Sequence, residues 1–166
     1  MRRKLALLAG AAISPLLSVT GAQAQVLLET VVVTAQKVEE DQQRVPISLT
    51  ALSGNQLQAL GLDNTLEIVQ QVPNLRVQSF SPNITTFNIR GVSQAAFSDH
   101  NEAPIAVYVD DAYLPSQNVL SQQLFDLERV EVLRGPQGTL FGRNATGGLI
   151  QYVSRRADDE ELNGYL

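Results

Sequence analysis

Two short β-prone segments joined by a glycine-rich connection constrain the fold of this chain more than any other feature. Residues 130–133, VEVL, alternate in polarity, and residues 148–153, GLIQYV, form a second short run. Period-two alternation and short apolar runs between turn signals are typical of β-strands. Gly135-Pro136 marks a turn directly after the first run. The sequence therefore predicts two strands held together by a connection with special backbone requirements.

The connection, GPQGTLFGRNATGG, also has to be tested as a phosphate-binding loop. A P-loop requires Gly-Lys followed by Ser or Thr at the start of a helix, but Gly142 precedes Arg143 and Gly148 precedes Leu149. The dinucleotide fingerprint G-x-G-x-x-G is absent as well. We expect a conformational role instead, because glycine adopts backbone angles and close approaches that other residues cannot. The expected structural glycines are Gly91, Gly135, Gly138, Gly142, Gly147 and Gly148.

Cap and alternation patterns predict the remaining elements. The expected helices are 54–60, capped by Ser53 and ended by Gly61, and 65–71, begun by Asp63 or Asn64 and ended by Pro73. The further expected strands are 47–51, 75–78, 87–90 and 105–110. Long polar loops are expected at 79–86, 93–104 and 113–121. Loops of this length often contain functional residues. Short strands with few short helices indicate the α+β class.

The first 24 residues have the three parts of a secretory signal peptide. A basic start of Arg2, Arg3 and Lys4 precedes an apolar run over 5–17 and the small-residue site Ala22-Gln23-Ala24. The alternative, a membrane anchor, is disfavoured because the run is shorter than the ~20 residues of a spanning helix. We expect export and cleavage after Ala24.

Composition excludes several function classes. The chain carries 12 basic and 17 acidic residues, a poor balance for binding nucleic acid. With no Cys and one His, it lacks the ligands of common metal sites and the parts of common catalytic sets. Asp110 and Asp111 are adjacent on an expected strand, so they point to opposite faces and more naturally begin a turn. We expect no catalytic residue, no metal site, no cofactor and no enzyme activity.

The segment before the expected domain leaves two readings open. Residues 26–35, VLLETVVVTA, are rich in β-forming Val and Thr, whereas residues 36–44 are polar and unpatterned. The segment is either the first strand of the domain or a strand that adds to the sheet edge of another protein. We expect residues 36–44 to be a flexible tether and the compact domain to begin near Val45.

The order of the motifs resembles the N-terminal plug of TonB-dependent outer-membrane receptors. The matching segments are ETVVVTA at 29–35, VPNL at 72–75, NIRGV at 88–92, AVYVDDAYL at 106–114 and the long block at 124–157. The resemblance implies an α+β plug domain with a small mixed sheet, short helices and long loops. The implied domains are a signal peptide (1–24), a TonB box with its tether (25–44), the plug (45–157) and a linker with the start of a first barrel strand (158–166). The implied TonB box is Glu29, Thr30, Val31, Val32, Val33, Thr34 and Ala35.

The same resemblance implies the partners and the location. The TonB box pairs with the C-terminal domain of TonB, and the plug fills an outer-membrane β-barrel that is normally part of the same chain. The implied function is gating and energy coupling during uptake of a small molecule, typically a ferric siderophore, with cobalamin and carbohydrates as other family substrates. Arg90 and Arg134 resemble the family's partners for barrel carboxylates, and Arg143 is a third arginine that we expect at this interface.

Only nine residues follow Ala157, too few for the ~8 strands of the smallest bacterial barrel. We therefore expect no complete barrel in this chain, and no conduction by the chain alone. The alternative reading is a free periplasmic plug-like binding protein, or a truncated receptor fragment without transport activity.

Overall fold

The computed structural model describes residues 31–81, 84–94, 101–116 and 124–157. Several expectations lie outside these described residues. They are the signal peptide 1–24 with its cleavage after Ala24, the box residues Glu29 and Thr30, and the linker 158–166.

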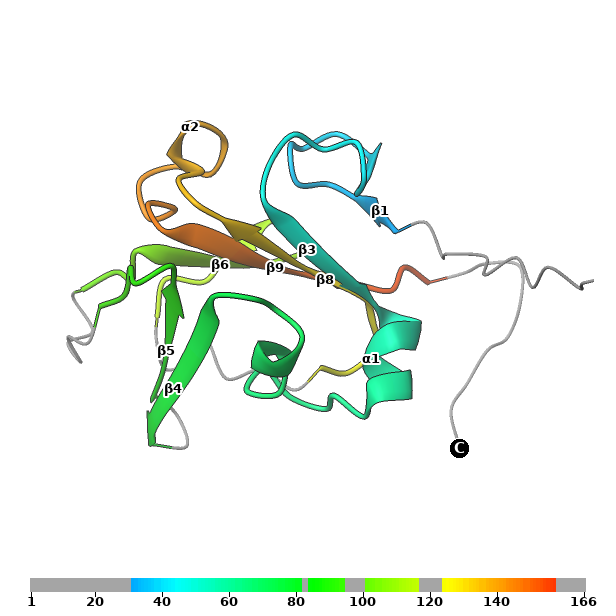
Figure 1. Cartoon of the computed structure of the whole chain (residues 1–166), viewed down its shortest axis with the longest axis horizontal. Helices are drawn as coiled ribbons and strands as arrows, with labels where there is room; N and C mark the ends of the chain where they lie inside the picture. Colours follow the sequence, from blue (N-terminus) through cyan, green and yellow to red (C-terminus); the bar gives the residue numbers. More distant parts are fainter. Residues whose placement is uncertain (1–30, 82–83, 95–100, 117–123, 158–166) are drawn as a thin grey trace, which may run out of the picture.

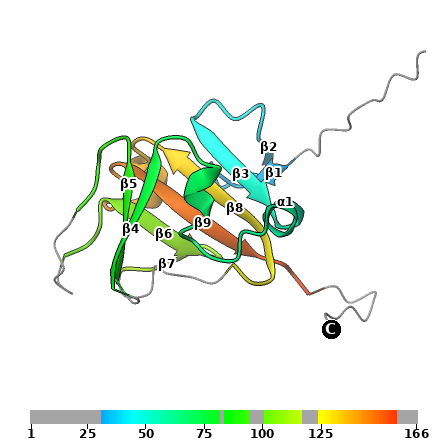
Figure 2. The same ribbon diagram turned by 60° about the horizontal axis from the view of Figure 1, so that its bottom comes forward.

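A five-stranded mixed sheet forms the centre of the molecule (Figure 2). Its strand order is β3 (Leu49–Ser53), β8 (Leu127–Arg134), β9 (Gly148–Ser154), β6 (Ile105–Val109) and β7 (Ala112–Tyr113). β6 runs parallel to β9, and the other neighbours are antiparallel. This small mixed sheet with few short helices confirms the predicted α+β class.

One face of the sheet is covered by helices and by a long hairpin. The covering elements are α1 (Gly54–Leu60), the 3-10 helix η1 (Ile68–Gln70), β4 (Leu75–Ser81) and β5 (Ile84–Ile89), which lie below the sheet in Figure 1. Tyr152, Val130 and Val132 point to this face and are about 1% exposed. These side chains belong to the larger of two buried apolar clusters among the described residues. This cluster packs α1, η1 and the hairpin against the sheet.

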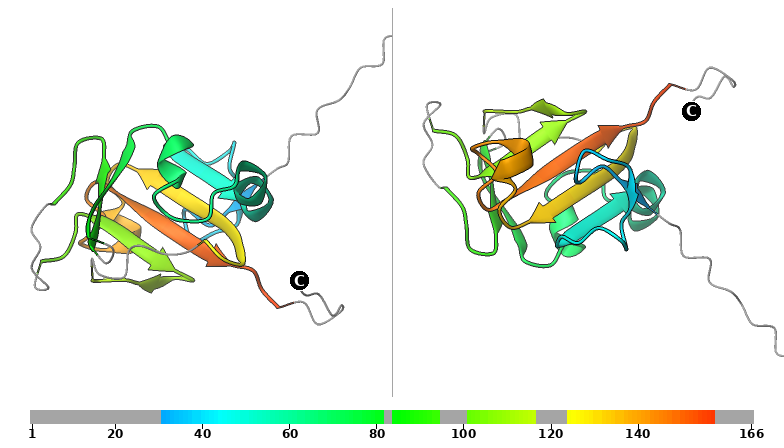
Figure 3. Two further views of the ribbon diagram at one scale, coloured as in Figure 1. Left: turned by 90° about the horizontal axis from the view of Figure 1, so that it is seen from below. Right: turned by 90° about the horizontal axis from the view of Figure 1, so that it is seen from above.

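The opposite face is covered by the beginning of the chain and by the glycine-rich connection. β1 (Val32–Val33) and β2 (Glu40–Asp41) form a two-residue antiparallel pair, and α2 (Gly138–Phe141) is one turn of helix within the connection. Figure 3 shows both lying over the sheet from above. Leu149 and Leu133 pack here against Val33 and Phe141. Both faces of β9 are therefore buried, which explains its nearly continuous apolar sequence.

The structure gives α1 the bounds that its caps predict. The Ser53 hydroxyl accepts from the Gln56 backbone N–H, and the Gln56 side chain accepts from the Ser53 N–H in return. Gly61 ends the helix in the left-handed region at φ 64°. Because each of these contacts spans three or four residues, local sequence is sufficient to define the helix.

The second expected helix, over 65–71, is wrong: only the 3-10 turn Ile68–Gln70 forms. The Asn64 side-chain oxygen accepts from the Leu66 N–H, and the Glu67 carboxylate accepts from the Asp63 N–H at 2.7 Å. Short polar side chains that bond to nearby backbone groups compete with helix formation. The residues Asp63 and Asn64, which were expected to begin a helix, therefore form a turn.

The loop expected at 79–86 is wrong over its described residues, because β4 continues to Ser81 and β5 begins at Ile84. Gln78 pairs with Thr86 and Ser79 with Thr85, and the register shifts between Ser79 and Ser81. The polar Ser and Thr side chains of residues 79–86 are typical of a loop and led to that prediction. Strand pairing uses backbone N–H and C=O groups instead, and these residues carry such groups as well.

Candidate functional site

The amino-terminal segment, residues 31–35, is paired and partly buried. Val33 and Ala35 are 0% exposed, whereas Val32 is 48% exposed. The Gln42 N–H donates to the Val31 carbonyl at 3.1 Å. Hydrogen-bonding residues alternate along an antiparallel strand, so the N–H and C=O of Val32 point to the edge opposite β2.

Residues 36–44, expected to be a flexible tether, instead fold back along the segment. The Lys37 N–H donates to the Thr34 carbonyl at 2.8 Å and closes a turn, in which Lys37 has a φ of 60°. The Lys37 ammonium lies 5.5 Å from the ring centre of Phe141 in α2. The packed structure therefore includes residues ahead of Val45, because Val33 and Ala35 supply an apolar cover for this face of the sheet.

Beneath the segment lies a buried ion pair that the sequence did not reveal. Arg129 and Glu131 are 7% and 0% exposed, and the Arg129 Nε donates to Glu131 Oε1 at 2.7 Å. The Thr34 N–H donates to the same oxygen at 2.9 Å, and Arg129 Nη2 donates to the Thr34 hydroxyl at 3.2 Å. We call Thr34, Arg129 and Glu131 the Thr34 cluster. The sequence does show charged residues at alternate positions of this strand, Arg129 and Glu131. Such alternation predicts a solvent-exposed face, so it did not indicate burial.

The structure brings Arg90 and Arg134 to one corner. The Arg90 N–H donates to the Asn74 carbonyl at 3.2 Å, and Arg134 Nη1 donates to the neighbouring Pro73 carbonyl at 3.3 Å. Arg90 Nη1 lies 3.3 Å from the position that a Cβ atom at Gly135 would take. Among the described residues, neither arginine forms an ion pair with a carboxylate.

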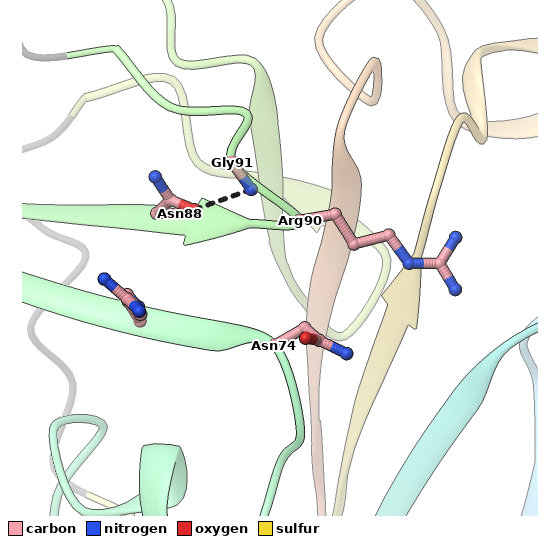
Figure 4. Close-up of a pocket in the computed structure, with 5 residues that line it drawn as sticks. Asn74, Asn88, Arg90 and Gly91 are labelled. Atoms are coloured by element: carbon pink, nitrogen blue, oxygen red, sulfur yellow. Dashed lines mark hydrogen bonds between the residues drawn. The ribbon is translucent and has the colours of Figure 1, made fainter.

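This corner borders an open pocket of about 550 Å³, which we call the arginine pocket (Figure 4). The Asn88 side-chain oxygen accepts from the Gly91 N–H at 3.0 Å and holds the turn after β5, while Arg90 extends from that turn. The pocket presents guanidinium and amide donors, so it suits an anionic oxygen group. Its lining residues are Asn74, Arg76, Asn88, Arg90 and Gly91.

Arg143 lies apart from the other two arginines. Its Nη2 donates to Glu102 at 2.8 Å, and its side chain is 82% exposed. Asn144 Nδ2 donates to the same carboxylate at 2.6 Å and to the Tyr113 hydroxyl at 2.7 Å. Burial raises the pKa of the Tyr113 hydroxyl, and the Asn144 hydrogen bond opposes this rise.

The expected structural glycines differ in what the backbone requires of them. Gly148, at φ 148°, could not carry a Cβ atom, which would lie 2.3 Å from the Leu133 carbonyl oxygen. A Cβ atom at Gly147 would lie 2.5 Å from the Ile105 side chain. Gly138 has open space and no positive φ. The remaining positions all have positive φ, and they are Gly91, Gly135 and Gly142.

The acidic pair after β6 forms a turn. Asp110 and Asp111 have φ values of 47° and 67°, and the Asp110 carboxylate accepts from the Ser154 N–H and hydroxyl. Within the described ranges, no group of three or more His, Cys, Asp or Glu side chains is placed to hold a metal ion. No described helix is long and apolar enough to cross a membrane.

Residues 41–149 match the family model described as the TonB-dependent receptor plug domain. The chain belongs to this family. The match begins within β2, covers every element from β3 to α2, and ends at the second residue of β9. The family assignment thus agrees with the resemblance that the sequence motifs showed.

The chain is similar to longer proteins that are named as a receptor and a transporter. It is 34% identical over 139 residues to the pesticin receptor of Yersinia pestis, covering 82% of this chain and 20% of the relative. It is 29% identical to the vitamin B12 transporter BtuB of Vibrio vulnificus over 90% of this chain and 24% of that protein. The plug therefore spans about a fifth to a quarter of the length of these curated relatives, which are named as a receptor and a transporter.

The fold of the plug also matches solved receptors. The ferric yersiniabactin uptake receptor FyuA from Yersinia pestis aligns with a TM-score of 0.60 at 32% identity, covering 68% of this chain and 17% of that chain. The pyoverdine outer membrane receptor FpvA from Pseudomonas aeruginosa aligns with a TM-score of 0.61 at 18% identity, covering 76% and 18%. At that lower identity the likeness concerns the fold alone.

Proposed function

We propose that this plug is the gating and energy-coupling module of a TonB-dependent outer-membrane receptor that takes up a small molecule such as a ferric siderophore. Membership of the plug family supports the module, and the names of related proteins support the substrate class. Those names refer to ferric yersiniabactin, vitamin B12 and rhizobactin.

We propose that residues 29–35 are the TonB box. The observation that carries this proposal is the direction of the Val32 backbone: its N–H and C=O point away from β2 and leave an edge to which another strand can add. Backbone pairing tolerates many side chains, and the valine-rich segment has the extended conformation already. A pull by TonB on this edge would reach the plug through the hairpin of β1 and β2.

We further propose that Arg90 and Arg134 bind carboxylates of the enclosing barrel. Their convergence at the Pro73-Asn74 corner, beside an open pocket and without a described carboxylate partner, supports this role. Arg143 is a weaker member of the set because Glu102 already neutralises it. Residues 1–24 would direct export, with cleavage after Ala24 and final location in the outer membrane.

The test of the TonB-box proposal uses calorimetric titration of the full chain with the C-terminal domain of TonB. We expect Val32→Pro to weaken binding at least about tenfold, because proline removes the N–H that would donate to the added strand. The substitution spares the pairing with β2, since the Val32 N–H faces the other edge.

Val32→Thr is the matched control, because threonine keeps the backbone donor and the preference for strands. It should bind TonB like the unchanged chain. Equal affinity of the proline variant, or no binding by the unchanged chain, would rule out coupling through this segment.

A further inference from the structure

The Thr34 cluster lies on the face of β8 that the amino-terminal segment covers. Arg129, Glu131 and Leu133 share this face, because side chains alternate along a strand, and Leu133 packs beside Val33. A charged pair would normally face water at such positions. Here Glu131 is 0% exposed, because the amino-terminal segment covers it.

Glu131 binds the segment through one oxygen. Its Oε1 accepts the Thr34 N–H at 2.9 Å, the Arg129 Nε at 2.7 Å and the Thr34 hydroxyl at 3.4 Å. Its Oε2 is buried and has no hydrogen-bond partner among the described residues. The carboxylate is thus held in place by Arg129 and is directed at the Thr34 backbone.

The Thr34 N–H lies on the edge that a partner strand would use. Val32 and Thr34 are two residues apart, so their N–H groups point to the same side of the strand, opposite β2. The Glu131 carboxylate oxygen therefore stands where a carbonyl of an added strand would stand. Thr34 and Arg129 also line a cavity of about 370 Å³, so this edge borders open space.

We propose that the buried Arg129–Glu131 pair regulates access to the amino-terminal segment: Glu131 caps the Thr34 N–H in place of a partner strand, and pairing with the partner requires that this contact break. This inference rests on the proposed function, since it names the regulation of the same segment. Arg129 and Glu131 act as positioning residues, because they hold the segment and do not touch the partner.

The experiment measures amide hydrogen exchange of the full chain by mass spectrometry, together with titration by the C-terminal domain of TonB. In Glu131→Gln, the charge-assisted acceptor of Thr34 becomes neutral and weaker. We expect exchange of the amides in residues 31–35 to rise at least about fivefold, and TonB affinity to rise in parallel. Exchange in β9 should stay unchanged.

A double variant guards against misfolding. Arg129→Met with Glu131→Leu replaces the buried pair by apolar side chains, which usually preserves stability. If the pair only stabilised the fold, the apolar replacement would leave exchange in residues 31–35 unchanged. If Glu131 caps the Thr34 N–H, the cap is lost and exchange in residues 31–35 still rises. The matched control is Glu128→Gln, because Glu128 pairs with the same Arg129 from a half-exposed position and leaves Thr34 untouched.

The outcomes separate the two proposals. Unchanged exchange in both variants, or an equal rise in the Glu128→Gln control, overturns the role of Glu131 even where TonB binds. Faster exchange without any TonB binding supports the cap on Thr34 and refutes the proposed TonB box.

Discussion

At the scale of single residues, burial changes the chemistry of the Tyr152 hydroxyl. Tyr152 is 1% exposed, and its hydroxyl lies 3.1 Å from the Thr65 Oγ1. Burial raises the pKa of Tyr152 above its ordinary value of 10.0, and the Thr65 hydrogen bond opposes this rise. The phenol therefore stays neutral in the folded plug at a pH where an unfolded chain would ionise it.

We expect Tyr152→Phe to lower the free energy of unfolding by about 1 kcal/mol at pH 7, through loss of that hydrogen bond. The raised pKa also predicts a pH effect. The contribution of Tyr152 is complete below its unfolded pKa of 10.0, and it falls as the pH rises above that value.

Urea unfolding at pH 7 and at about pH 10.5 measures both effects. The unchanged plug should lose more stability between the two pH values than Tyr152→Phe. An equal loss would mean that the Tyr152 hydroxyl is not the buried group that titrates.

At the scale of elements, the connection between β8 and β9 depends on one glycine more than on its neighbours. We expect Gly148→Ala to lower the free energy of unfolding by about 3 kcal/mol, because the methyl group meets the Leu133 carbonyl and alanine is strained at φ 148°. Gly138→Ala, in open space at the first position of α2, should be neutral or stabilising by up to about 1 kcal/mol.

Urea denaturation followed by far-ultraviolet circular dichroism compares the two variants. Similar destabilisation of both would contradict the view that the glycine-rich block has unequal backbone requirements. Two neutral results would contradict the close approach of β8 to Gly148.

The contrast between the two expected helices is also an element-scale result. Ser53 and Gly61 predicted α1 because a cap acts within one turn. Asn64 and Glu67 formed a hydrogen-bonded turn in place of a second helix, and the same residue types begin helices elsewhere. Residue types alone do not distinguish the start of a helix from such a turn. The two structures differ in which backbone N–H group each side chain contacts.

At the scale of the whole molecule, the plug is not equally stable throughout. β1 and β2 pair through two residues each, whereas β8 pairs with β3 through five residues and with β9 from Leu127 to Arg134. Fewer backbone pairs and fewer buried side chains predict a lower free energy of local opening. The hairpin of β1 and β2 should therefore open before the five-stranded sheet.

We expect the Val33 amide to exchange with an opening free energy at least about 2 kcal/mol below that of Val130. Native-state hydrogen exchange of the full chain in low urea measures both values. One common opening energy for hairpin and sheet would contradict a separable segment, and with it the idea that a pull releases the segment before the plug.

Local sequence by itself determined the α+β class, the four central strands β3, β6, β8 and β9, α1 and the turn at Asp110-Asp111, because alternation, caps and turn residues act over a few residues. The short edge strand β7 was not predicted. Motif order determined the family. Only the tertiary structure decided that residues 36–44 pack as a hairpin and that Arg129 and Glu131 are buried beneath Thr34. It also decided that Arg90 and Arg134 meet at one corner. The Thr34–Glu131 and Pro73–Arg134 contacts join residues 97 and 61 positions apart, and their energies depend on which segment covers which face of the sheet.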